Sequence, residues 1–200
     1  MYLLTEAIRI ENKELQHIDL HNCRINKARK IVFGQTESID LSKIINIPTN
    51  IGNERYKCRV IFHTDKTEYE IHPYVQRKIE TLKIVHHNTI EYAFKNTDRS
   101  QLDEAFSKRD GCDDIIIVKN GFISDSWAAN IILFDGKKWV TPNTPLLRGT
   151  QREYLLKTGF IEEQTIKADN LKSFSKIRLI NAMIDFDRAP EIDIQTQVIL

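Results

Sequence analysis

An Asn-Gly pair between two β-prone segments is the feature that most restricts how this chain of 200 residues folds. Residues 114–118 (DIIIV) are rich in β-branched side chains, which favour strands. Asn120 and Gly121 follow, and these residue types accept the positive φ angles that a two-residue hairpin turn requires. The pattern predicts a hairpin with a buried first strand, and its second strand leads into the segment SDSWAANI, residues 124–131.

Other β-prone segments occur along the whole chain. Their turn-rich boundaries predict strands at 2–10, 55–63, 68–74, 79–86 and 89–94, and later in AANIILF, KKWV and IRLINAMIDF. Strands and helices mix without regular βαβ alternation, so we expect an α+β fold with a mainly β C-terminal part. Pro73 is taken as the linker between two lobes, a small N-terminal lobe at 1–75 and a larger one at 76–200.

Helix signals lie between the strands. In the segment 19–33, Asp19 is the expected N-cap and Gly34 the stop. Asp98 is expected to cap a helix whose apolar side chains recur at helical spacing. Two shorter helices are predicted at 40–45 and in GTQREYLLKTG, which ends at Gly159.

Composition narrows the classes of partner. The chain has 29 basic and 28 acidic side chains and a formal net charge of +1, which favours neither nucleic acid nor an acidic membrane surface. Three cysteines without a CxxC pair argue against a disulfide framework or a zinc ribbon. No apolar run approaches the roughly 20 residues of a membrane-spanning helix, and Glu6 and Arg9 interrupt any signal peptide. We expect a cytoplasmic protein.

Three places carry residues suited to chemistry. Lys95 follows the β-prone run TIEYAF, where desolvation could lower its pKa enough for Schiff-base formation, although most lysines are solvated surface charges. Gly149 in LRGTQR opens a helix whose first N–H groups suit a phosphate, although a plain turn capped by Thr150 is the commoner arrangement. Asp125 lies among apolar neighbours and needs a cation or a donor, and a hydrogen-bonded turn would also satisfy it.

A metal site is disfavoured. His86 and His87 are the only adjacent histidines, and neighbouring residues of a strand point to opposite faces. They would not easily bind one ion together. No nucleophile elbow, phosphate-binding GK[ST] loop or dinucleotide GxGxxG motif is present.

Taken in order, the motifs resemble those of the class IV aminotransferases, which are fold-type IV pyridoxal-phosphate enzymes. TEAIRIENKELQHIDLHNCRI resembles the N-terminal run of the family, and it places His21 and Arg24 on the H-x-x-R motif. FKNTDR resembles the segment of the cofactor lysine. CDDIIIVKNGFISDSWAANIILFDGKKWVTP resembles the longest family signature, LLRGTQR its phosphate turn and LINAM its last strand. The resemblance covers nearly all of residues 5–185.

The resemblance implies pyridoxal 5'-phosphate as cofactor and a role for each matched residue. Lys95, 30 residues before Asp125, would be the catalytic lysine that bonds the cofactor, in preference to Lys83. Arg24 would contact the phosphate, and Asp125 would pair with the pyridine nitrogen. The other residues implied for cofactor binding are Asn130, Gly149, Thr150, Gln151, Asn181 and Ala182.

Within this family, three functions remain open. Asn181-Ala182 favours a 4-amino-4-deoxychorismate lyase, because family transaminases more often carry a Thr-bearing pair there. An amino-acid transaminase, branched-chain or D-specific, is the second possibility, and a non-catalytic relative is the third. The resemblance implies a small-molecule substrate and a homodimer. The resemblance starts at the "ETIR" strand of the family, so the part of the family's substrate pocket that comes before this strand has no counterpart. Two residues also depart from the family pattern: Asp125 stands where Glu is more usual, and Arg148 where Pro is frequent.

Overall fold

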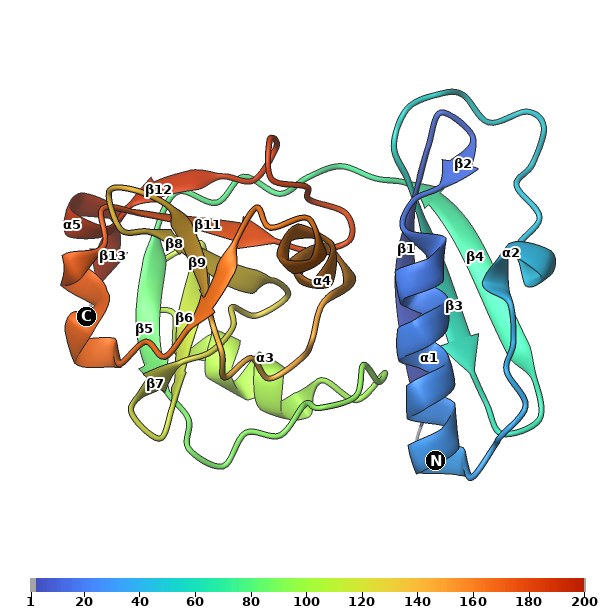
Figure 1. Ribbon diagram of the computed structural model, residues 1–200, viewed down its shortest axis with the longest axis horizontal. Helices are drawn as coiled ribbons and strands as arrows, with labels where there is room; N and C mark the ends of the chain where they lie inside the picture. The colour runs from blue at the N-terminus through green and yellow to red at the C-terminus, as the bar shows by residue number, and fades with distance from the viewer. Residues whose placement is uncertain (1–2, 200) are drawn as a thin grey trace. The chain divides into compact units, whose positions relative to one another are not determined.

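The computed structural model describes residues 3–199, which form two compact units. Unit 1 extends to Gln76 and also contains Phe94–Asp98, whereas unit 2 contains Arg77–Ala93 and the chain from Arg99 onward. Figure 1 labels most elements of both, and each unit has a core of its own. The expected α+β class is confirmed, because several sheets are combined with helices. Within residues 3–199, no helix has the length and apolarity needed to cross a membrane.

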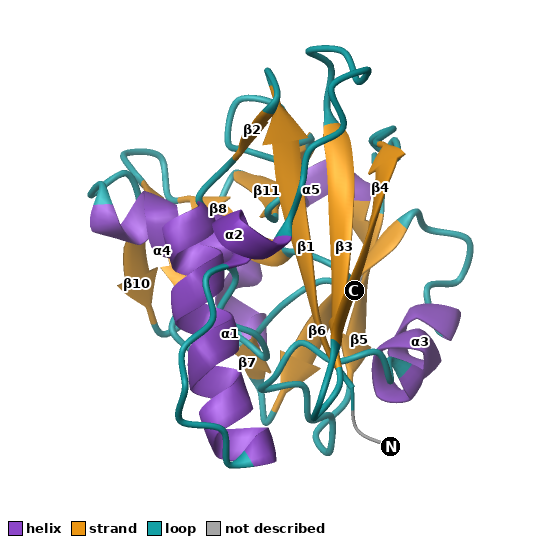
Figure 2. Cartoon of the chain, turned by 90° about the vertical axis from the view of Figure 1, so that its right-hand side faces the viewer, coloured by secondary structure: helices purple, strands orange, loops and turns teal. Residues whose placement is uncertain are grey.

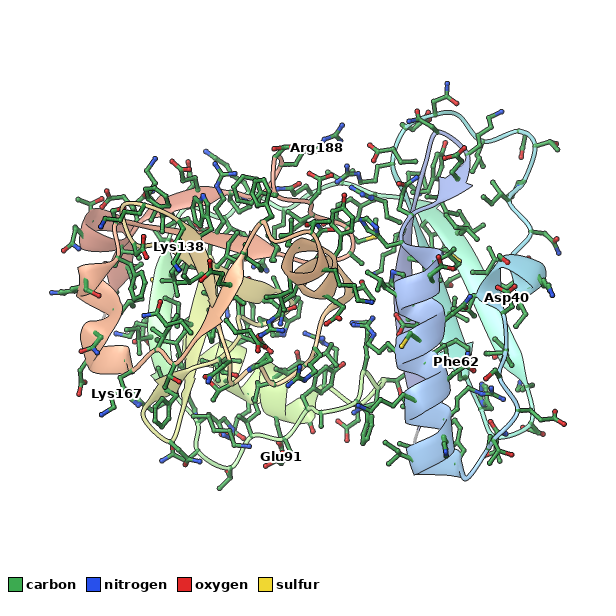
Figure 3. The ribbon with its side chains drawn as sticks, in the orientation of Figure 1. Asp40, Phe62, Glu91, Lys138, Lys167 and Arg188 are labelled. Carbon is green, nitrogen blue, oxygen red and sulfur yellow. The ribbon has the colours of Figure 1, made fainter. Side chains whose placement is uncertain are left out.

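Unit 1 is built on one antiparallel sheet in the order β2-β1-β3-β4, whose three long strands run side by side in Figure 2. Leu4, Ile8 and Ile10 alternate along β1 and are fully buried. Helices α1 and α2 contribute the other side of this core, and Phe62 of β3, labelled in Figure 3, is one of its fully buried members. The elements are β1 (Leu4–Glu11), β2 (Glu14–Leu15), α1 (Ile18–Phe33), α2 (Leu41–Ile44), β3 (Tyr56–Phe62) and β4 (Thr67–Pro73).

The helix ends of unit 1 agree only in part with the prediction. Gly34 ends α1 at φ 71°, as expected for a left-handed C-cap. The predicted N-cap Asp19 is wrong: His17 holds this position in a left-handed conformation, and Asp19 lies in the first turn. The short helix α2 is capped by Asp40 (Figure 3), whose carboxylate accepts a 3.0 Å hydrogen bond from the Ser42 N–H.

Pro73 is part of the sheet and not a linker. It is the last residue of β4 and pairs with Tyr56 of β3. β4 is an edge strand, where a residue without an N–H is tolerated. The chain also returns to unit 1 at Phe94–Asp98, a segment that the expected division at residue 75 left in the larger lobe. It belongs to unit 1 because Thr5 N–H donates to Lys95 O at 2.9 Å and Asn96 bridges to Leu4.

Unit 2 contains a five-stranded sheet, β10-β9-β8-β11-β12, and a four-stranded sheet, β13-β5-β6-β7. β6 is buried from Asp114 to Val118, because its two faces lie in different clusters. Ile116 and Val118 pack with residues of the five-stranded sheet, whereas Ile115 and Ile117 pack with α3. The strands are β5 (Leu82–His86), β6 (Asp114–Lys119), β7 (Phe122–Ile123), β8 (Asn130–Phe134), β9 (Trp139–Pro142), β10 (Glu162–Gln164), β11 (Lys176–Ile180), β12 (Glu191–Asp193) and β13 (Val198–Ile199).

The Asn-Gly hairpin is confirmed between β6 and β7. Asn120 and Gly121 have φ angles of 52° and 81°, and Val118 pairs with Ile123. The predicted helix before Gly159 is also present as α4. The helices of unit 2 are α3 (Ser100–Ser107), α4 (Thr150–Lys157), α5 (Ile194–Gln197) and the 3-10 helix η1 (Ala168–Ser173).

Two predictions before α3 are wrong. Residues 89–94 form no strand, although Ile90 and Tyr92 are buried. Side chains bind the local backbone there: Gln101 accepts from Glu91 N–H at 2.7 Å, and Lys119 donates to Ile90 O at 2.7 Å. The N-cap of α3 is Arg99 without a side-chain cap, and not Asp98.

Candidate functional site

A buried carboxylate organises the candidate residues of unit 1. Glu6 alternates with Leu4 and Ile8 along β1, so its side chain enters the core and is 1% exposed. One of its oxygens lies 2.7 Å from Nδ1 of His21. Arg24, one turn further along α1, donates to both oxygens, through Nε at 2.8 Å and through Nη2. The H-x-x-R spacing therefore places both side chains of the motif on one carboxylate.

Glu6 is ionised in this cluster, whereas His21 is neutral. Burial alone would raise the pKa of Glu6, but the positive charge of Arg24 and the interactions with His21 outweigh it and hold this pKa at about 2. Burial lowers the pKa of His21 below its ordinary value, so the ring is neutral at pH 7. The charge of Lys95 adds to this lowering. Two cations, Arg24 and Lys95, thus accompany one carboxylate.

Lys95 is held through its backbone. Its carbonyl oxygen accepts from Thr5 N–H, and Thr97 N–H donates to Leu3 O at 3.0 Å. These bonds fasten the segment to the start of β1, two residues before Glu6. Lys95 follows a loop and not the strand that the sequence predicted. Lys83, the rejected alternative, lies in β5 of unit 2 and is 3.5 Å from a carboxylate oxygen of Asp110.

A second buried carboxylate organises the candidate residues of unit 2. Asp125 is 5% exposed, and its Oδ1 accepts from Nδ2 of Asn130 at 2.8 Å. Its Oδ2 accepts from the backbone N–H of Leu147 at 2.9 Å. Burial raises the pKa of Asp125 to about 6, although these donors and the charge of Arg152 oppose the rise. Its amide partners stabilise the anion less than a direct cation would, so the carboxylate can accept a charged N–H partner.

The turn after Leu147 leads into α4. Gly149 is the N-cap, without a side-chain cap, and the helix starts with a 2.9 Å bond from Glu153 N–H to Gly149 O. Thr150 and Gln151 are buried in the first turn, and Oε1 of Gln151 has no hydrogen-bond partner. The first N–H groups and the positive end of a helix dipole favour a phosphate at such a position.

The last candidate pair, Asn181 and Ala182, lies just after β11. Oδ1 of Asn181 accepts from the N–H groups of Met183 at 2.9 Å and Ile184 at 3.0 Å, so it closes its own turn. Nδ2 donates to the carbonyl of Ala128 at 3.0 Å, in the loop after Asp125. Most of the amide's hydrogen-bonding capacity is therefore used inside the protein.

Comparison with known proteins decides the family. The model of the class IV amino-transferases matches residues 3–191. The chain belongs to this family. An uncharacterized protein of Haemophilus influenzae is 38% identical over 185 residues, which are 92% of this chain and 98% of the relative.

Solved structures agree with this assignment. A candidate 4-amino-4-deoxychorismate lyase from Haemophilus somnus is similar at a TM-score of 0.86 and 31% identity, over 92% of this chain and 97% of that one. A candidate amino-acid aminotransferase from Mesorhizobium loti has a TM-score of 0.82 at 18% identity, covering 96% and 99%. A hypothetical aminotransferase from Mycobacterium tuberculosis in its PLP-bound form has a TM-score of 0.76 at 15% identity, covering 95% and 80%. The last two likenesses concern the fold.

Pyridoxal 5'-phosphate is the cofactor of this family of enzymes. The residues present fit it. In unit 1, Arg24 is a cation that suits a phosphate, and Lys95 carries an amine that can bond an aldehyde. In unit 2, the buried carboxylate of Asp125 suits a protonated pyridine nitrogen, and the start of α4 suits the phosphate.

Sequence reasoning missed Glu6 and Arg152. Glu6 could have been found, because a carboxylate between Leu4 and Ile8 on the apolar face of a strand must have a partner. Arg152 is 1% exposed, and its Nη2 donates to Pro142 O at 2.9 Å and to Glu163 at 2.6 Å. Its position in the phosphate motif was visible, but its burial and the effect of its charge on the pKa of Asp125 were not.

Proposed function

We propose that this protein is a pyridoxal-phosphate-dependent 4-amino-4-deoxychorismate lyase, which releases pyruvate and forms 4-aminobenzoate. The observation that carries the proposal is the likeness to the Haemophilus somnus candidate lyase, at 31% identity over nearly the full length of both chains. The Asn181-Ala182 pair supports it, because the resemblance associates this pair with lyases of the family. On this proposal the product serves folate synthesis, and the expected cytoplasmic location stays a prediction.

We assign the cofactor contacts to both sets of residues. Arg24 and the turn at Gly149–Gln151 would hold the phosphate, and Asp125 would keep the pyridine nitrogen protonated. When bound, pyridoxal phosphate supplies an electron sink for the carbon that carries the amine. Lys95 would bond the cofactor until the substrate's amine takes its place, and the freed lysine amine would then serve as the base that moves the proton at this carbon.

Asn181 has a narrower role in this proposal than its amide chemistry first suggested. Its Oδ1 is occupied by two backbone N–H groups, so it is not the acceptor for a substrate hydroxyl. Its contribution would be to fix the loop after β11 against Ala128, beside the segment that carries Asp125.

The test is product formation from aminodeoxychorismate by the purified protein loaded with pyridoxal phosphate. A lyase produces 4-aminobenzoate and pyruvate in equal amounts, without any added 2-oxo acid, and retains the aldehyde form of its cofactor. Conversion of the cofactor to its amine form by branched-chain or D-amino acids, with no 4-aminobenzoate, would make the protein a transaminase. A protein that neither binds the cofactor nor forms product would be the non-catalytic relative.

A further inference from the structure

One asparagine connects the two parts of the candidate site in unit 2. Asn130 is the first residue of β8 and is 4% exposed. Its Nδ2 donates to Oδ1 of Asp125 and to the carbonyl of Leu147, both at 2.8 Å. The N–H of Leu147 donates in turn to Oδ2 of Asp125 at 2.9 Å. Asp125, Asn130 and Leu147 therefore form a closed set in which each residue bonds to the other two.

The other end of the same amide lies against Gly149. A Cβ atom at this position would overlap Oδ1 of Asn130. The backbone itself does not require glycine, because its φ of −72° and ψ of 147° are open to any residue. Glycine is therefore needed at position 149 only because the side chain of Asn130 leaves no room for a Cβ atom. The asparagine could yield only by giving up two hydrogen bonds of a buried amide, which is costly.

We propose that Asn130 is a positioning residue that couples the Asp125 carboxylate to the turn from Leu147 to Gly149. Both N–H bonds of its amide are used on protein acceptors, and its oxygen faces Gly149, so it acts through its neighbours and not on the cofactor. The proposal rests on the proposed cofactor contacts, in which Asp125 serves the pyridine nitrogen and the turn serves the phosphate. A displacement of the turn would then displace the Asp125 carboxylate, and a displacement of the carboxylate would displace the turn.

The coupling can be measured without any cofactor. The titration of Asp125 in the apo-protein is followed by carbon NMR of its side-chain carboxyl, with Asp125→Asn to assign the signal. Asn130→Ala removes a donor to the anion and should raise the pKa of Asp125 above the value of about 6 in the unaltered protein. Gly149→Ala should raise it as well, because the new methyl group displaces Asn130. The Asn130→Ala/Gly149→Ala double variant should titrate like Asn130→Ala alone.

A binding measurement tests the consequence for the site. Pyridoxamine 5'-phosphate is the probe, because it forms no covalent bond with a lysine, and calorimetry on the apo-protein gives its affinity. Made alone, Gly149→Ala should weaken the binding of pyridoxamine 5'-phosphate at least tenfold. Made in the Asn130→Ala variant, it should weaken this binding less than twofold. Asn143→Ala, an exposed asparagine of the same unit that donates to Thr165, is the control and should change neither readout.

The outcomes separate the possible errors. A Gly149→Ala protein whose Asp125 titrates as in the unaltered protein would overturn the coupling. A changed titration with unchanged affinity for the probe would support the coupling and instead contradict the proposed cofactor contacts. If Gly149→Ala does not fold, rescue of folding by Asn130→Ala supports the proposal, and equal failure of the double variant contradicts it.

Discussion

Glu6 and Asp125 are both buried, and the partners of each oppose the effect of burial, yet their pKa values shift in opposite directions. Arg24 outweighs the burial of Glu6, whose pKa is about 2, whereas burial prevails at Asp125, whose pKa is about 6. Glu6 therefore stabilises the fold above its unfolded-state pKa of about 4.5, and this contribution is lost as the pH falls toward 2. The contribution of Asp125 is present below an unfolded-state pKa of about 3.8 and is lost as the pH rises through 6.

At the residue scale, Glu6→Gln should destabilise the protein by roughly 3 kcal/mol at pH 7, because it leaves the half-buried Arg24 without its counter-charge. The difference should shrink as the pH falls below 4.5, because Glu6 is then protonated in the unfolded chain while it stays ionised in the folded protein down to its pKa of about 2. Urea unfolding at pH 7, 5 and 4 measures both effects. Glu70→Gln is the control: its pair with Arg59 is about half exposed, so the expected loss is below about 0.5 kcal/mol at each pH.

The assignment of Lys95 is also decided by single residues. Lys95→Ala should abolish the visible absorbance of the lysine-bound cofactor, together with the adduct that borohydride fixes on the chain. Lys83→Ala should retain both, because this side chain is placed in β5 beside Asp110. Peptide mapping by mass spectrometry locates the adduct. An adduct on Lys83 would show that the lysine motif was aligned wrongly.

At the element scale, the hairpin between β6 and β7 carries the chain into the Asp125 loop. Asp125 lies two residues after β7, and its carbonyl accepts from Ile117 of β6 at 2.8 Å. β6 is buried on both faces by two separate clusters, which gives this loop a rigid base. The turn at Asn120-Gly121 sets the register of the pair.

Gly121→Ala should therefore destabilise the protein by about 1–2 kcal/mol, the cost of holding a residue with a Cβ in the left-handed region. No atom lies within 4 Å of a Cβ placed there, so the cost is conformational and not steric. Equilibrium unfolding in urea gives the value. The cost of Gly121→Ala should be the same in the Asn130→Ala background, in contrast to the cost of Gly149→Ala, which depends on Asn130. If the cost of Gly121→Ala vanished in the Asn130→Ala background, the conformational explanation would be refuted.

At the scale of the whole molecule, the chain passes between its units three times, after Gln76, after Ala93 and after Asp98. The short return segment carries Lys95 and is anchored on β1. Membership of the class IV aminotransferase family implies a homodimer related by a two-fold axis, and this stays a prediction. Light scattering at assay concentration should give twice the chain mass of 23.4 kDa. A monomer that still turns over substrate would refute it.

The sequence alone determined the features whose partners are close together in the chain. The Asn-Gly turn, the Gly34 stop and the order of the family motifs could be predicted because local backbone preferences and residue spacing define them. The same information placed Lys95, Asp125 and the phosphate turn on their motifs. It failed for residues 89–94, where β propensity was overridden by the side chains of Gln101 and Lys119.

Only the tertiary structure decided which charged groups form ion pairs and which side chains exclude one another. Glu6 meets Arg24 because β1 and α1 pack together, and Asn130 excludes a side chain at Gly149 because β8 and the start of α4 converge. The pKa of a buried carboxyl depends on such neighbours and on the loss of water, and neither is encoded in residue type. The motifs therefore named the candidate residues of the site, whereas packing determined their protonation and their partners.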